Sequence, residues 1–141
     1  MLPKILIPVN DSAAAERTIA AIIANRERFP VTLTLLHVVD TDRLAYRMIP
    51  DFQVEMVRDK AMQVGETTLN RIKEKFNSSG ISTIARLESG SPREVITRVA
   101  NDENFSLLVI GRRGMGEVRD VLFGSVSNHV LHHVNCPVLL V

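Results

Sequence analysis

Residues 105–126, FSLLVIGRRGMGEVRDVLFGSV, carry the pattern that decides the fold of this chain. The apolar run Phe105–Ile110 is too short for a helix and is rich in Leu, Val and Ile, which favours a buried strand. The run stops at glycine, and a helical pattern begins near Val126 after the glycines at Gly111, Gly114, Gly116 and Gly124. A strand, a glycine-bearing loop and the free N–H groups of a helix start together favour an anion. This stretch therefore predicts a phosphate-binding loop.

The rest of the chain alternates strand and helix patterns. Strands are expected at 4–9, 31–39, 81–87, 105–110 and 137–141, the third of them at a sheet edge because its side chains alternate in character. Helices are expected from an Asn10–Ser12 cap to about Arg28, from about Pro50 to Asn77, from Pro92 to about Asn101, and to about Val134. Gly65 interrupts the apolar stripe of the long second helix, which leaves room for a local bend. The stripe consists of Val54, Val57, Ala61, Val64, Ile72 and Phe76. Such alternation predicts a parallel sheet with helices on both faces.

Composition limits the function classes. The chain has 141 residues, 45% of them hydrophobic, which fits one domain over residues 1–141. A net charge of +1 with mixed signs gives no basic field for nucleic acid. Cys136 stands alone, which excludes an internal disulfide and suits a reducing compartment. No stretch approaches the roughly 20 apolar residues of a membrane span, and the N-terminus does not read as a signal peptide, so we expect a cytoplasmic protein with no membrane partner.

Three loops are expected to meet at the carboxyl edge of the sheet, where such sheets bind ligands. They hold Asn10–Asp11 after the first strand, Val38–Asp40 after the second and Gly111–Gly116 after the fourth. The glycines match neither a P-loop, which needs a Lys after its last glycine, nor the dinucleotide fingerprint, which would follow the first strand. They spell G-x2-G-x9-G-S, in the residues Gly111, Gly114, Gly124 and Ser125.

Together with the turn Pro8–Ser12, the segment Leu36–Asp40 and the C-terminal Asn135–Val141, this motif resembles the universal stress protein family, in its ATP-binding branch. The resemblance covers essentially the whole chain. The fold expected is a doubly wound α/β sandwich whose five-stranded parallel sheet has the order 3-2-1-4-5. The resemblance also implies a homodimer formed through the C-terminal strand Pro137–Val141, and a stress-response regulator whose nucleotide changes its association with an unidentified protein partner.

The resemblance further implies an adenine-nucleotide site, for ATP or alternatively ADP or AMP. Pro8 and Asn10, with Val9 between them, would line the adenosine, and Val38 would meet the adenine through its backbone. Gly111 would lie by the ribose. The phosphates would be held by Gly114, Gly124, Ser125 and Val126, with Arg112 as a further candidate. Nucleotide-binding members usually have Asp where this chain has Asn10, and Asp11 follows one place later. Because Asn carries no charge and binds divalent ions less well, the dependence on Mg²⁺ is left open.

Each feature has a simpler alternative. Gly111 and Gly114 would also serve to turn a strand into a helix, and the charged loop residues Arg112, Arg113 and Arg119 would also serve as solvated side chains. His37 is expected to be a satisfied histidine of the core or of its rim, and not a catalyst. His129, His132 and His133 share one helix, and the spacing puts His129 and one of the other two on one face. No third ligand accompanies them, so no metal site is expected.

No set of residues indicates catalysis. The chain has no Ser-His-Asp set, no paired carboxylates in a glycine loop and no HEXXH motif. Slow ATP hydrolysis or autophosphorylation near Ser125 and Ser127 is kept as a second hypothesis. A third is a structural dimer that binds no nucleotide.

Overall fold

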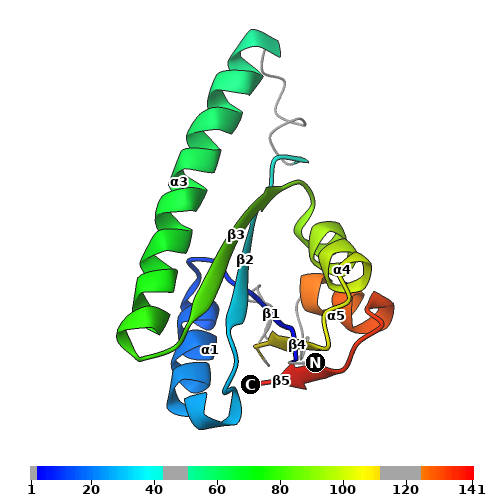
Figure 1. Ribbon diagram of the computed structural model, residues 1–141. Helices are drawn as coiled ribbons and strands as arrows, with labels where there is room; N and C mark the ends of the chain where they lie inside the picture. Colours follow the sequence, from blue (N-terminus) through cyan, green and yellow to red (C-terminus); the bar gives the residue numbers. More distant parts are fainter. Residues whose placement is uncertain (1–2, 43–50, 112–124) are drawn as a thin grey trace.

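The computed structural model describes residues 3–42, 51–111 and 125–141, which form a sheet with helices on both sides (Figure 1). The sheet has five parallel strands in the order β3-β2-β1-β4-β5. The strands are β1 (Ile5–Pro8), β2 (Leu33–Val39), β3 (Thr83–Ser89), β4 (Leu107–Ile110) and β5 (Val138–Leu140). This order confirms the predicted α/β fold, with the third strand at one edge and the C-terminal strand at the other.

Side-chain alternation along the central strands divides the core into two halves. Ile5 and Ile7 of β1 face helices α1 (Ala13–Ala24) and α3 (Asp51–Ser78), which bury Ile19, Ile22, Leu69, Ile72 and Phe76. Leu6, between them, faces α4 (Pro92–Asp102) and α5 (Ser125–His133), which bury Val95, Ile96, Val99 and Val130. Both faces of the sheet are therefore covered, as its near-continuous apolar strands require.

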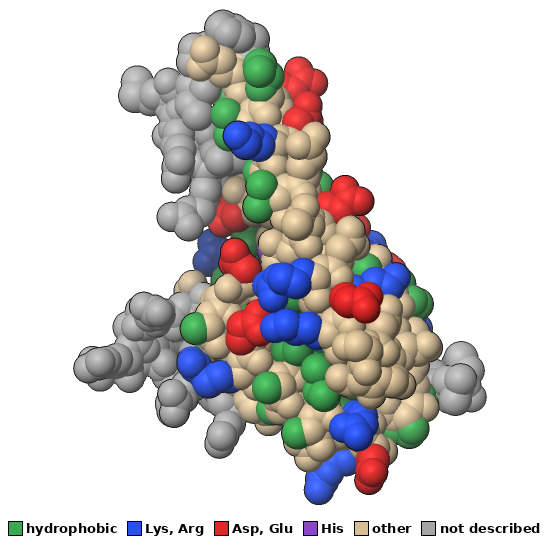
Figure 2. Space-filling view, turned by 90° about the vertical axis from the view of Figure 1, so that its left-hand side faces the viewer, with side chains coloured by type: hydrophobic (Ala, Val, Ile, Leu, Met, Phe, Trp, Pro, Cys, Tyr) green, Lys and Arg blue, Asp and Glu red, His purple; other side chains and the backbone are tan. Residues whose placement is uncertain are grey.

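Helix α3 differs from the sequence prediction in two ways. It runs unbroken from Asp51 to Ser78, so Gly65 does not interrupt it. Its apolar stripe is buried only in the second half, because the first half extends past the end of the sheet (Figure 1). Val64, expected on the buried side, is 58% exposed, and hydrophobic side chains show along this part of α3 in Figure 2.

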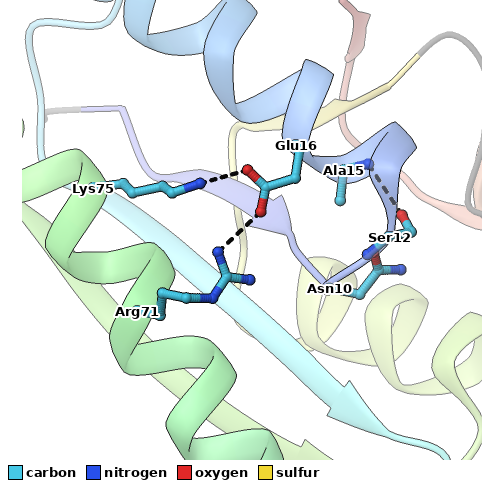
Figure 3. Close-up of polar contacts among 6 residues, drawn as sticks. All are labelled: Asn10, Ser12, Ala15, Glu16, Arg71 and Lys75. Atoms are coloured by element: carbon cyan, nitrogen blue, oxygen red, sulfur yellow. Dashed lines mark hydrogen bonds and ion pairs between the residues drawn. The ribbon is translucent and has the colours of Figure 1, made fainter.

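Helix α1 begins with two side-chain bonds that the sequence pattern predicts. The Ser12 backbone N–H donates to Asn10 Oδ1 at 2.9 Å, and Ser12 Oγ accepts from the Ala15 N–H at 3.1 Å (Figure 3). The first bond forms an Asx turn and the second is an N-cap. The helix ends at Ala24, earlier than expected, and a separate 3₁₀ turn, η1 (Arg26–Arg28), follows it.

Glu16 in the first turn of α1 ties that helix to α3. Its carboxylate accepts from Arg71 Nη1 at 3.0 Å and from Lys75 Nζ at 2.5 Å (Figure 3). The bond from Lys75, and then the bond from Arg71, hold the pKa of Glu16 below its ordinary value. These two bonds, the Glu16 clamp, hold the start of α1 and the turn at Asn10 in place relative to α3.

Among the helices of the described segments, none is long and apolar enough to cross a membrane.

Candidate functional site

A groove of about 510 Å³ opens where β2 ends against α3. Its strand side is formed by His37, Val38, Val39 and Asp40, and Asp11 joins it from the turn after β1. Its helix side is formed by Val57, Lys60, Ala61, Val64, Gly65 and Thr68 of α3. The volume lies in the range of small-molecule sites, and aliphatic walls with a few polar groups at the mouth are typical of them. The exposed valines of α3 thus form a wall of this groove.

The backbone of Val38 faces the space beyond the end of β1. Pairing between β1 and β2 ends at Pro8 and Leu36. The last hydrogen bond between these two segments runs from the Val9 N–H to the carbonyl of Leu36, at 2.8 Å. Backbone groups of alternate residues in a strand point to the same side. The N–H and C=O of Val38 therefore point toward the β1 side of β2, as the carbonyl of Leu36 does. At Val38 the neighbouring strand has already turned away toward α1. This geometry offers one donor and one acceptor to a planar heterocycle.

A hydrogen bond joins the ring of His37 to the backbone of Val9 beside the groove. The carbonyl of Val9 can only accept, so His37 Nδ1–H is the donor in their 2.9 Å contact. In the neutral ring this leaves Nε2 as an acceptor. Val9 is 2% exposed and uses both its N–H and its C=O within the protein. His37 is thus the satisfied rim histidine that the sequence predicts.

A second, much smaller cavity lies where β1 and β4 end beside the start of α5. It measures about 30 Å³ and is lined by Pro8, Ala15, Thr18, Ile96, Ile110, Gly111, Val126, Ser127 and Val130. That volume suits a water molecule and not a phosphate group. The cavity nevertheless shows that Pro8, Gly111 and Val126, from three different elements, come together. Ser125, the first residue of α5, is exposed beside them.

Two glycines bring helices into contact with strand ends. A Cβ at Gly111 would lie 2.2 Å from Thr18 Oγ1 of α1. A Cβ at Gly65 of α3 would lie 2.6 Å from Val39 Cγ2 of β2. Both distances are well below van der Waals contact, so a side chain at either position would force its neighbour to move. For Gly65 this gives a packing reason for a glycine inside the helix.

Asn10 is partly committed to the fold. Its Oδ1 accepts the bond that starts α1, so its Nδ2 amide is the group left to meet a ligand. Asp11 lines the groove and is exposed. An exposed carboxylate thus follows directly after Asn10 in the chain.

The predicted site residues are brought together only in part. Val38 lies on the large groove, and Pro8, Gly111 and Val126 line the small cavity. Arg112, Gly114 and Gly124 lie outside the described residues. Sequence reasoning missed Lys60 and Ala61, because a helix-period pattern does not show which part of a long helix extends beyond its sheet.

Charges at the groove are mixed. Asp11 and Asp40 contribute carboxylates and Lys60 contributes an ammonium group. A triphosphate in the groove itself would lie near the carboxylates of Asp11 and Asp40, whereas the N-terminal end of a helix such as α5 favours an anion through the helix dipole. In the described segments, no group of three or more His, Cys, Asp or Glu side chains is arranged to hold a metal ion.

Comparison with known protein families and curated sequences gives consistent results. The pattern of the Universal stress protein family matches residues 1–141. Universal stress protein YxiE of Bacillus subtilis is 27% identical over 147 residues, which cover 100% of this chain and 99% of that protein. A putative universal stress protein of Staphylococcus aureus strain USA300 is 31% identical over 139 residues, covering 97% of this chain and 82% of that protein.

Solved structures share the fold. The hypothetical protein MJ0577 superposes with a TM-score of 0.83 at 26% identity, covering 100% of this chain and 96% of its own. A universal stress protein family protein from Arabidopsis thaliana with AMP bound has a TM-score of 0.69 at 20% identity, covering 99% and 91%. A universal stress protein in complex with cAMP has a TM-score of 0.70 at 17% identity, covering 99% and 96%.

Proposed function

The chain belongs to the universal stress protein family, and on that premise we propose that it binds an adenine nucleotide at the carboxyl edge of its sheet and acts as a stress-response regulator. The observation that carries the proposal is the backbone edge of Val38, which faces the space left by the end of β1 beside a groove of about 510 Å³. The adenine ring would pair with this edge and lie against the aliphatic wall of the groove. Structural neighbours with AMP and cAMP support an adenine nucleotide as the ligand class.

The charges at the groove support one orientation of the nucleotide. Carboxylate oxygens accept well from hydroxyl groups, so Asp11 suits the ribose, with the Asn10 amide beside it. Phosphates would turn away from the two carboxylates and toward Gly111, Ser125 and Val126 at the start of α5, where backbone N–H groups and the helix dipole favour them. Each charge-assisted bond there contributes about 1.5–3 kcal/mol. ATP, ADP and AMP share this arrangement and differ only in how many such bonds they make.

A thermal-shift titration with ATP, ADP and AMP, each with and without Mg²⁺, tests the site. At 100 times Kd, a ligand that binds only the folded protein stabilises it by about 2.7 kcal/mol, a shift of several degrees. Ala61→Trp places an indole in the groove and should abolish the shift. Ala20→Trp, the same change at an exposed position of α1, should retain it. No shift with any nucleotide, in protein refolded to remove bound ligand, would refute the proposal. Phosphate release measured in the same samples tests slow ATP hydrolysis.

We also propose that two copies associate through β5. This strand is at an edge of the sheet, and its Leu139 is 38% exposed. An apolar edge strand is normally covered or paired. Leu139→Glu should therefore give a monomer by light scattering. Ile84→Glu, at a 57% exposed position of the opposite edge strand β3, should leave the dimer intact. A monomeric wild-type protein, or a dimer broken only by Ile84→Glu, would contradict this interface.

A further inference from the structure

Strand β3 forms an edge of the sheet and has one side without a backbone partner. It pairs with β2 along its whole length, and with no other strand among the described residues. The N–H of Leu33 in β2 donates to the Ser82 carbonyl at 3.0 Å, so the even-numbered residues of β3 are the ones that bond to β2. Alternate residues of a strand point to opposite sides, so the N–H and C=O groups of Ala85 and Leu87 face away from the sheet.

These outward groups can be matched only by another extended chain. The N–H and C=O groups of Ala85 and Leu87 have no hydrogen-bond partner in the part of the chain that the structure describes. An α-helix cannot pair with them because its own backbone bonds are internal, whereas an extended segment presents the same alternation of donors and acceptors. The strand TIARLES also contains neither Pro nor Lys, two residues that commonly block such an edge.

The side chains along this edge add a chemical pattern. Those of Ala85 and Leu87 pack toward α1 and α3, so Ile84, Arg86 and Glu88 lie on the opposite face, beside α4. Ile84 is 57% exposed. Arg86 pairs with Glu88 at 3.0 Å and also with Glu103, the residue that ends α4, so two carboxylates share one guanidinium. Among the described residues, Glu88 is bonded to no other cation.

We propose that the outer edge of β3 binds an extended segment of another protein, which adds one strand to the sheet. Its backbone pairs with Ala85 and Leu87. An apolar β-branched side chain of the segment lies beside Ile84, and a Lys or Arg four residues from it lies beside Glu88, because paired strands advance by the same distance per residue. The nucleotide site takes no part in this binding.

A second copy of the chain does not suit this edge. Copies are already proposed to associate through β5, which is the opposite edge of the sheet. Pairing of copies at both edges would join molecules into an open-ended chain in place of a closed dimer. The occupant is therefore a segment of a different protein.

Amide exchange of the free protein, measured by NMR, tests whether the edge is open. The outward N–H groups of Ala85 and Leu87 should exchange about tenfold faster, or more, than those of Ile84 and Arg86, which bond to β2. Equal protection of the four amides would show that the edge is covered and would overturn the proposal.

The probe for binding is the capped peptide KTSTVTSTK, titrated into the full chain up to millimolar concentration. Its valine stands four residues from a lysine in both directions, so either strand orientation fits. The amide signals of Ala85 and Leu87 should shift, and their exchange should slow. The control is the same peptide with N-methyl groups on two adjacent central amides, which point to opposite edges, so that neither edge can pair fully. Equal binding of the methylated peptide, no shift at all, or shifts confined to β5 would refute strand addition at β3.

Variants of the chain locate the contact. Ala85→Pro removes an outward N–H and leaves the bonds to β2 intact, a change that edge strands tolerate, so peptide binding should be lost while the amides of Ile84 and Arg86 stay protected. Glu88→Gln should weaken binding about twofold to fivefold, the effect of one exposed ion pair. The matched control Glu74→Gln, at an exposed position of α3, should bind as wild type does.

Three results with these variants would contradict the proposal. One is unchanged peptide binding by Ala85→Pro. Another is equal binding by Glu88→Gln and Glu74→Gln, which would refute the basic residue assigned to the partner. The third is a loss of molar mass in Ala85→Pro by light scattering, which would show that a second copy of the chain occupies the edge.

Discussion

Gly111→Ala separates the two roles that this glycine can have, in packing and in binding. The new Cβ would lie 2.2 Å from Thr18 Oγ1 and 3.4 Å from Thr18 Cβ. The backbone of Gly111 does not have the positive φ that only glycine adopts readily, so the hydroxyl of Thr18 is the main obstacle. Thr18 Oγ1 is itself bonded to the Ala14 carbonyl at 3.1 Å, which resists its moving aside.

The size of the effect follows from this contact. Overpacking of this kind costs about 1–3 kcal/mol, which lowers the melting temperature of a domain this size by about 3–10 °C. Thr18→Ala alone should be close to neutral, because the lost side-chain bond, about 0.5–1.5 kcal/mol, is offset by the better helix propensity of Ala. In the double variant the hydroxyl is absent, and the remaining distance of 3.4 Å is an ordinary contact.

A double-mutant cycle by chemical denaturation measures this coupling. The double variant should recover at least 1 kcal/mol, about a third or more of the single-variant loss, because the two residues are in contact. Nucleotide titration of the same proteins then isolates the second role. If the double variant regains stability but not binding, the ligand needs the space above Gly111. Additive stabilities of the two substitutions would refute the packing argument.

Two further predictions use contacts of α1. Ser12→Ala should destabilise the protein by about 1 kcal/mol, because it removes an N-cap bond, whereas Ser91→Ala should cost much less, because Ser91 has the N-cap position of α4 without a side-chain bond. Thermal melts of both variants measure the difference, and equal losses would contradict it. Glu16→Gln should cost at most about 1 kcal/mol at pH 7, since its partners are exposed. The folded pKa of Glu16 is lowered, so this stabilisation is present above its ordinary value of 4.5 and disappears as pH falls through the lowered value. Denaturation of both proteins from pH 7 to pH 2 should show their stabilities converging, and a constant gap would contradict the clamp.

Most of the fold could be predicted because each helix and strand has its own period of apolar residues in the sequence. Strand order follows from the family resemblance, and the edge position of β3 from the alternating side-chain character that residues such as Thr83 and Leu87 give to the third strand. The Asn10–Ser12 cap was predicted correctly because its bonds join residues two and three apart in the sequence. Contacts of this range depend little on tertiary structure.

Gly65 was interpreted less well. A glycine in a helical pattern normally signals a weak point, but here its missing side chain lets α3 touch β2 at Val39, 26 residues earlier. The exposed state of Val64 was missed for a related reason, since periodicity gives the apolar face of a helix and not the length of the surface that it meets. The same limit applies to the prediction of the site, because Lys60 and Ala61 border the groove only where α3 passes the end of β2.

The contact at Gly65 divides α3 into a part that packs on the sheet and a part that projects beyond it. The helix rests on the sheet at Gly65, and its free arm back to Asp51 is about 21 Å long at 1.5 Å per residue. A bend of about 10° at Gly65 would displace the tip by about 4 Å, while the part of α3 that Glu16 holds through Arg71 and Lys75 stays in place. This part of α3 also forms a wall of the groove. A ligand bound in the groove would therefore fix the angle of this part of the helix, and the position of the helix tip would depend on whether the groove is occupied.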